Sequence, residues 1–286
     1  NKVKFFFKKL LPSIFSSGIT QINILIGTII ASFEAGAVSY LYYADRIYQI
    51  NLAIAGIAVS TVSLPMLSKA FKNNNMKKLT NIQSKSFELS LLLSIPASLG
   101  LILASEEIVN ALFGYGTFSK EDVKLTADAL KYFGYGVPAF ALVKILSNFF
   151  FARDNTKTPF HISIVMVVIN ISISVSLFPS FGFIIIPIAT SLATWMGVLI
   201  YIYLLNTKKS LLLKIELIPN LIKILSSTII MSFILVLTLN NYASYLDYTY
   251  KFKAIYLISI VGFAAVVYLL SCYLLGILKI RNYKTN

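Results

Sequence analysis

Residues 40–56 read YLYYADRIYQINLAIAG, and this stretch places a carboxylate and a guanidinium side by side inside a long apolar run. Placing an arginine deep in a bilayer costs about 2.5–3.5 kcal/mol on insertion scales, so Arg46 should face protein or water. Two questions follow: whether the surrounding chain crosses a membrane, and what Asp45 and Arg46 contact there.

The composition answers the first question. Of the 286 residues 57% are hydrophobic and 13% are charged, and the mean hydropathy is +0.80. A soluble domain would need more charged surface than this. Apolar windows of about 20 residues, the length that spans a bilayer as a helix, recur along the whole chain. The sequence therefore predicts an all-α fold, a polytopic helical membrane protein.

The apolar windows predict eight transmembrane helices. Their approximate limits are 11–33, 36–68, 84–104, 127–152, 159–178, 182–205, 218–239 and 254–277.

The net charge of +14 lies mostly in short loops between these helices, which indicates a membrane surface rather than nucleic acid. Eighteen basic residues fall on one side of the predicted membrane. The five on the other side are Lys120, Lys124, Lys131, Lys251 and Lys253. By the positive-inside rule both termini are expected in the cytoplasm.

Two loop segments carry local signals. In residues 70–87, AFKNNNMKKLTNIQSKSF, Met76, Leu79 and Ile82 are three apart with lysines around them. This spacing suits either a short helix lying on an anionic inner leaflet or a solvated basic loop. Ser119 followed by Asp122 is typical of a helix start.

The helix that carries Arg46 has a polar-to-small stripe. At helical spacing one face holds Tyr42, Tyr43, Arg46, Gln49, Ala53, Gly56 and Ser60. Such a stripe favours a cavity lining or a close helix contact. Asp45 points about 100° away from Arg46, so we expect it to pair with other helices.

The predicted membrane interior has a positive balance. Arg46 and Lys144 lie within spans, against Asp45 as the clear acid. Uncompensated intramembrane cations mark a substrate path, and the planar fork of arginine suits a phosphate. Two alternatives are an internal ion pair for Arg46 and a snorkelling side chain for Lys144. Gln21 and Asn23 either line the path or bond neighbouring helices.

The sequence offers no signature of cofactor or metal chemistry. It has no cofactor glycine fingerprint and no metal-ligand spacing, so we expect no cofactor. A membrane enzyme that transfers phospho-sugars would need clustered acidic metal ligands near the inner face. The predicted cytoplasmic loops supply only Asp154 and Glu216, which favours a transporter over an enzyme.

Four segments carry a family resemblance. They are QINILIGTIIASFEAGAVSYLYYADRIYQ (21–49), LPMLSKAF (64–71), ALFGYGTF (111–118) and VKILSNFFFARDNTKTP (143–159). In order and spacing they resemble the second half of the MurJ (MviN) family of lipid II flippases. This family belongs to the multidrug/oligosaccharidyl-lipid/polysaccharide exporter superfamily.

The resemblance implies an architecture and an activity. Residues 1–205 would form the second six-helix transporter lobe, and residues 206–286 two additional helices that form a lipid-tail groove. The family moves the undecaprenyl-pyrophosphate-linked peptidoglycan precursor from the inner to the outer leaflet of the bacterial inner membrane by alternating access. Arg46 matches its cavity arginine and Asp45 the acidic neighbour, Lys144 matches a common lysine, and Tyr43 and Gln49 would line the cavity.

The chain also departs from the family pattern. The first six helices are absent from the sequence, so a separate chain would have to supply them. The membrane potential or an ion gradient would drive transport, yet Gly27 stands where many members have an aspartate in a region linked to cation binding. Asn170, Thr190 and Thr194 are the remaining oxygen donors there. The alternatives are a drug or ion antiporter of the same fold and an inactive truncated transporter.

Overall fold

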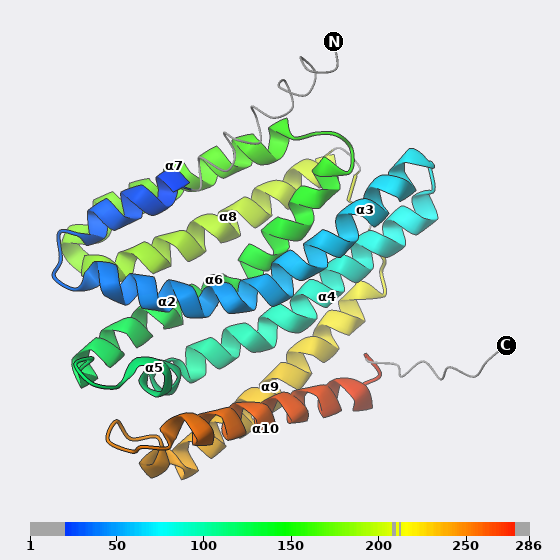
Figure 1. The fold of residues 1–286 in the computed structure, drawn as a ribbon. Helices are drawn as coiled ribbons and strands as arrows, with labels where there is room; N and C mark the ends of the chain where they lie inside the picture. The colour runs from blue at the N-terminus through cyan, green and yellow to red at the C-terminus, as the bar shows by residue number, and fades with distance from the viewer. Residues whose placement is uncertain (1–20, 208–209, 212, 278–286) are drawn as a thin grey trace.

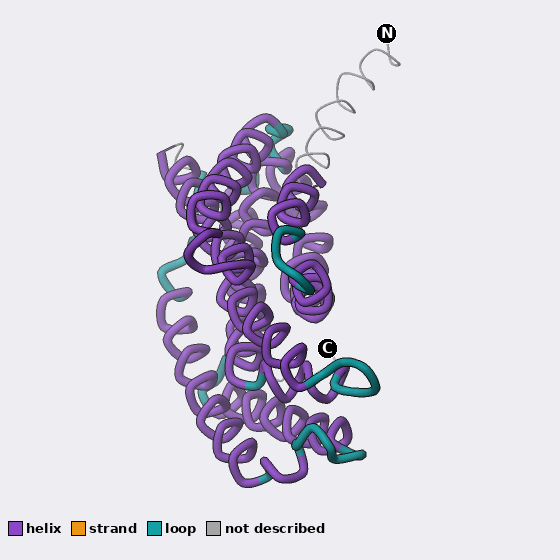
Figure 2. Tube along the Cα trace, turned by 90° about the vertical axis from the view of Figure 1, so that its left-hand side faces the viewer, coloured by secondary structure: helices purple, strands orange, loops and turns teal. Residues whose placement is uncertain are grey.

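The computed structural model describes residues 21–207, 210–211 and 213–277, and within them the chain is helical without strands (Figures 1 and 2). In chain order the helices are Gln21–Ala31, α2 (Ala37–Leu52), η1 (Ala53–Ala58), α3 (Val59–Lys72), α4 (Met76–Leu103), α5 (Ser105–Phe113), α6 (Lys120–Phe151), α7 (Lys157–Phe181), η2 (Gly182–Ile184), α8 (Ile185–Thr207), α9 (Leu217–Asn241), η3 (Ala243–Tyr245) and α10 (Lys253–Leu274).

The prediction of an all-α fold with eight spans is confirmed. Six stretches of the described residues are long and apolar enough to cross a membrane, namely α2–η1–α3, α4, α6, α7–η2–α8, α9 and α10. The stretch Lys157–Thr207 contains two spans, α7 and α8, which the turn at Gly182 separates. Gln21–Ala31 is the described part of the first predicted span. Residues 11–20 of that span and both chain ends lie outside the described residues.

The spans alternate in direction, which gives the bundle two distinct ends. At one end, called the α5 end, α2 and α6 both begin, and the Tyr40 hydroxyl donates a 2.8 Å hydrogen bond to Asp122. At the opposite end, called the α3–α4 end, the backbone N–H of Lys214 donates to Ser84 Oγ at 2.9 Å. This last bond holds the connection that leads from α8 to α9.

Helix α6 lies at the centre of the bundle. In its most apolar 18-residue window 78% of the residues are buried, compared with 44% or less in the other spans. Two hydrophobic clusters surround α6, one toward each end of the bundle, with contributions from α4 and α8 to both ends. A third cluster joins α9 and α10 to α4 and α5, so this pair packs on the outside of the six-helix part (Figure 1).

The segment that follows α3 differs from both predicted forms. Residues from Met76 onward are neither a separate surface helix nor a solvated loop, because they form the first turns of the 28-residue helix α4. Leu79 and Ile82 are only 2% and 6% exposed and belong to the core. A spacing of three residues fits a membrane-facing stripe and a core-facing stripe equally well. In this structure the stripe faces the core.

The predicted helix start at Ser119 is confirmed. Ser119 and Asp122 form a reciprocal capping box, in which the Asp122 backbone N–H donates to Ser119 Oγ and the Ser119 backbone N–H donates to the Asp122 carboxylate. Helix α6 therefore begins at Lys120, seven residues before the predicted span. The preceding α5 is a short helix that the hydropathy pattern did not predict.

The span that contains Arg46 is not a regular helix. Between α2 and α3 it forms six residues of π-helix, Ala53–Ala58. Gly56 lies in this segment where the backbone meets α6: a Cβ at this position would lie 3.2 Å from Ala141 Cα. The absence of a side chain permits this close approach of the two helices.

The turn between α7 and α8 depends on a second glycine. Gly182 has a φ of 61°, a conformation that favours glycine. The next residue, Phe183, donates its backbone N–H to the Glu34 carboxylate at 2.7 Å. Glu34 lies in the turn before α2, so this hydrogen bond joins the two turns at the α5 end.

Candidate substrate-binding surface

Arg46 lies on an open face of α2. Its side chain is exposed, and the guanidinium carbon lies 4.6 Å from the centre of the Tyr42 ring. Within residues 21–207, 210–211 and 213–277, no carboxylate lies within 4.0 Å of the guanidinium nitrogens. The described residues thus provide a cation–π contact for Arg46 but no internal ion pair.

Asp45 bonds within its own helix. The Gln49 side chain, one turn further on, donates a hydrogen bond to the Asp45 carboxylate. The expectation that Asp45 would pair with another helix is therefore wrong. Side chains four residues apart lie next to each other on a helix, so Gln49 is close enough to bond the Asp45 carboxylate without any group from a neighbouring helix.

The predicted stripe on α2 divides into two parts. Arg46 and Gln49 are exposed, whereas Tyr43 packs its ring against Phe113 and Phe118, with ring centroids 4.7 and 5.4 Å apart. Beyond them the π-helix rotates the chain, and Gly56 is buried against α6. The free polar surface on this helix is therefore concentrated at Arg46 and Gln49.

Lys144 lies on α6 beside a buried polar cluster. Its side chain is exposed, and its backbone carbonyl accepts a 3.3 Å hydrogen bond from Ser60 Oγ. Asn148, only 3% exposed, donates to the Ser60 carbonyl and to Ser60 Oγ, both at 2.8 Å, and to Ser63 Oγ at 3.2 Å. These bonds fix the α3–α6 contact next to Lys144, and no sequence pattern predicted this role for Asn148.

The two cations lie at different depths of the bundle. Ser60, which contacts the Lys144 backbone, follows Arg46 by 14 residues. At 1.5 Å per residue this corresponds to about 20 Å along the helix. Arg46 and Lys144 therefore do not form one pocket.

Gln21 and Asn23 differ in their surroundings. Gln21 is exposed at the first described position. Asn23 accepts a 2.8 Å hydrogen bond from Asn170 on α7, and Thr190 on α8 donates to the same Asn170 side chain at 3.4 Å. Asn23 thus bonds a neighbouring helix. Across the described residues no group of three His, Cys, Asp or Glu side chains is arranged to hold a metal ion.

An apolar groove lies beside the Arg46 helix. It has a volume of about 440 Å³ and is lined by α2, α4, α5, α9 and α10. Helix α2 contributes Ile47, Ile50 and Asn51, and α10 contributes Tyr268, whose hydroxyl donates to the Leu92 carbonyl at 2.7 Å. The wall is otherwise hydrocarbon, so the groove suits an apolar chain rather than a charged ligand.

Comparison with known proteins gives consistent results. The family model described as "Lipid II flippase MurJ" matches residues 1–257. The chain is 44% identical over 190 residues to the probable lipid II flippase MurJ of Rhizobium meliloti (strain 1021), covering 66% of this chain and 36% of that protein. It is 39% identical over 262 residues to the probable lipid II flippase MurJ of Rickettsia prowazekii (strain Madrid E), covering 89% of this chain and 50% of that protein.

A solved structure shares the fold and the sequence pattern. "Lipid II flippase MurJ, inward closed conformation" superposes with a TM-score of 0.77 and 28% identity, covering 95% of this chain and 54% of that one. The chain thus spans between about a third and about half of the length of these relatives. With a family match over most of its length, the chain belongs to the lipid II flippase MurJ family, which is a family of multi-pass membrane transporters and not of enzymes.

Proposed function

We propose that this chain forms the second half of a lipid II flippase and acts with the first six helices of that transporter. Together they move the undecaprenyl-pyrophosphate-linked peptidoglycan precursor from the inner to the outer leaflet of the bacterial inner membrane by alternating access. The observation that carries the proposal is Arg46: a cation on an open face, without a described carboxylate partner, beside an apolar groove.

The proposed parts follow the packing. Residues 1–205 are the second transporter lobe, built around α6, and residues 206–286 are the additional helix pair. The apolar groove between α4 and this pair would hold the isoprenoid tail, because its wall is almost free of polar groups. The open face of α2, with Arg46 and Gln49, would meet the head of the lipid.

Electrostatics then assigns the roles of the charged residues. A diphosphate cannot enter hydrocarbon unaided, and a fixed cation in a hydrated cavity lowers that barrier. Arg46 would contact the diphosphate through its fork of N–H donors. The Asp45 carboxylate accepts a hydrogen bond from Gln49 and, as the next residue in the chain, also attracts Arg46, so it offsets part of the positive charge that a diphosphate would meet. Lys144, about 20 Å further along, would attract the same head at another depth. The exposed Gln21 would add to the proposed lining, whereas Tyr43 and Asn23 would support it through their contacts with Phe113, Phe118 and Asn170.

Orientation and driving force follow from charge. The α3–α4 end carries the many loop lysines, so we place it and both termini in the cytoplasm, with the α5 end outside. Transport needs no cofactor. An inside-negative potential favours outward movement of an anionic head by about 2.3 kcal/mol per charge per 100 mV, so the membrane potential or an ion gradient can drive turnover.

Complementation tests the proposal. A flippase-depleted bacterium would receive this chain together with a first-half chain, in parent, Arg46→Ala and Arg46→Lys forms. We expect rescue by the parent, partial rescue by Arg46→Lys and loss of rescue by Arg46→Ala. The matched control is Lys124→Ala, which removes an exposed cation of α6 near the α5 end.

Three results would contradict the proposal. Equal rescue by Arg46→Ala and the parent removes Arg46 from the mechanism. Absence of rescue with and without the first-half chain, despite normal membrane insertion, indicates an inactive truncated transporter. Rescue failure combined with proton- or sodium-dependent drug efflux indicates an antiporter.

A further inference from the structure

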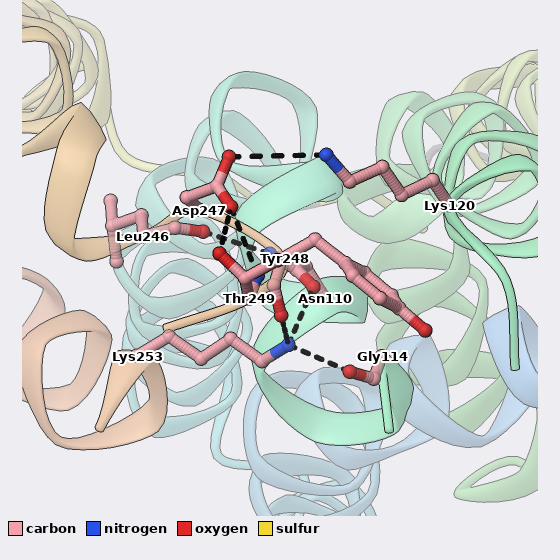
Figure 3. A network of polar contacts seen from close by, with 8 residues as sticks. All are labelled: Asn110, Gly114, Lys120, Leu246, Asp247, Tyr248, Thr249 and Lys253. Carbon is pink, nitrogen blue, oxygen red and sulfur yellow. Dashed lines mark hydrogen bonds and ion pairs between the residues drawn. The ribbon is translucent and has the colours of Figure 1, made fainter. Parts of the chain in front are cut away.

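Lys253 is a buried cation with a complete set of partners (Figure 3). By sequence Lys253 falls just before a predicted span, among the five basic residues on the less basic side of the membrane, but its exposure is 1%. Its Nζ donates to Asn110 Oδ1 at 2.9 Å, to the Gly114 carbonyl at 2.7 Å and to the Tyr248 carbonyl at 2.8 Å. The rings of Tyr115 and Tyr248 lie 4.3 and 4.7 Å from the same nitrogen.

The partners of Lys253 come from two parts of the molecule. Asn110 belongs to α5, and Gly114 and Tyr115 belong to the connection from α5 to α6. Tyr248 lies in the α9–α10 connection, and Lys253 is the first residue of α10. Two further bonds join the same segments. Asn110 Nδ2 donates to the Leu246 carbonyl at 2.8 Å, and the Tyr248 hydroxyl donates to the Phe118 carbonyl at 2.6 Å. We call this set of contacts the Lys253 clasp.

We infer that Lys253 is a positioning residue that fixes the α9–α10 pair to the α5 end of the six-helix part and thereby sets the width of the apolar groove. An ammonium that makes three charge-assisted hydrogen bonds in a buried site holds its partners far more firmly than an exposed ion pair does. The relevance for a lipid tail rests on the proposed function, but the mechanical claim does not.

The groove lies between the two places where the helix pair is held. At the α5 end the clasp joins the α9–α10 connection to α5, whose Ile108 lines the groove. At the α3–α4 end the segment before α9 is held by Arg153, which donates to the Ser210 carbonyl at 3.1 Å, and by the Lys214–Ser84 bond. Both ends of the α9–α10 pair are thus fixed to the six-helix part. The helix pair and the six-helix part should therefore move together as one rigid body.

Hydrogen exchange of this chain in lipid nanodiscs tests the clasp directly. In Lys253→Met the amides of residues 246–250 and 110–118 should lose protection by about tenfold or more, because each charge-assisted hydrogen bond limits local opening. The matched control is Lys251→Met, which removes an exposed lysine two positions earlier. It should leave protection at the parent level.

Spin-label distances test the effect on the groove. After replacement of the buried Cys272 by alanine, labels at Ile258 on α10 and Lys124 on α6, both exposed, report the separation of the helix pair from the six-helix part. We expect one narrow distribution for the parent and for Lys251→Met. For Lys253→Met the width should increase by about twofold as the loop opens locally.

The possible results separate the claims. Unchanged exchange and distances in Lys253→Met overturn the clasp. Lost protection with an unchanged distance distribution overturns the positioning role, because the loop then opens without moving the pair. If Lys253→Met does not fold, Asn110→Ala removes the Oδ1 that accepts from Lys253 Nζ, and unchanged exchange at 246–250 in that variant would overturn the inference. None of these readouts requires transport, so they remain decisive if the flippase proposal fails.

Discussion

Arg46 and Lys253 are two cations in an apolar chain, and their surroundings are opposite. Lys253 is 1% exposed and uses all three of its N–H groups on fixed acceptors (Figure 3). Arg46 is exposed, stacks on the Tyr42 ring and has no ion pair within 4.0 Å among the described residues. A cation whose N–H donors are all hydrogen-bonded within the protein stabilises the fold. A cation whose N–H donors are free can still bind a ligand. The difference lies in the free donors rather than in the charge.

The largest expected effect is on stability. Replacing Lys253 by methionine leaves three buried carbonyl oxygens without a donor and should destabilise the chain by about 2–4 kcal/mol. Arg46→Met should change stability by about 0.5 kcal/mol or less, because the residue is exposed and has no ion pair with the part of the chain that the structure describes. Thermal unfolding of both variants in one detergent measures the contrast. Equal losses would show that the two cations are not different in kind.

A smaller effect is expected for the polar cluster beside Lys144. Asn148 is buried and makes three hydrogen bonds to Ser60 and Ser63. Asn148→Ala should therefore cost about 2 kcal/mol of stability. Ser147→Ala serves as the control, since its hydroxyl donates only to the Lys144 carbonyl of its own helix. Equal midpoints of unfolding for the two variants would argue against a specific α3–α6 bond.

A third prediction concerns ligand binding without a change in fold. Lys144→Gln should weaken binding of a soluble pyrophosphate-bearing probe to the assembled protein by about tenfold, which corresponds to ~1.4 kcal/mol. Its thermal midpoint should stay at the parent value, because the Lys144 side chain is exposed. Titration calorimetry measures the affinity. Binding equal to that of the parent would show that Lys144 does not contact the probe, as expected if its side chain snorkels to the membrane interface.

The smallest effect is expected at the surface ion pair near the clasp. Lys120 and Asp247 are 4.0 Å apart and both are exposed. The pKa of the Asp247 carboxyl is lowered chiefly by hydrogen bonds from Thr249, and the charge of Lys120 contributes less. Lys120→Gln should therefore leave the unfolding midpoint within experimental error, since water screens exposed pairs. A clear loss of stability would extend the clasp to Lys120.

Much of the fold follows from sequence because hydropathy and length act locally. The eight spans and the helix start at Ser119 depend on the residues within each segment, and both are confirmed. The predictions that failed depend on tertiary contacts, which the local sequence does not reveal. Leu79 and Ile82 have the spacing of a membrane-facing stripe, but only the fold shows that α6 and α8 offer them a core.

The candidate site was predictable in its residues and not in its arrangement. Arg46 stands out because an arginine in an apolar run is costly, so its selection needed no structure. The Asp45–Gln49 bond and the separation of Arg46 from Lys144 depend on rotamers and on the path of α2 through the π-helix. Lys253 was missed because its partner Asn110 lies 143 positions away.

The π-helix at Ala53–Ala58 sets the angular phase between the two halves of its span. One residue added to a helix turns everything beyond it by about 100°. Deleting Ile57, whose side chain is exposed, would restore regular geometry and yet swing Ser60 and Ser63 away from Asn148. The length of this short segment is therefore constrained as tightly as the close approach at Gly56. Replacements at its exposed positions, Ile54 and Ile57, should be tolerated where single-residue deletions are not.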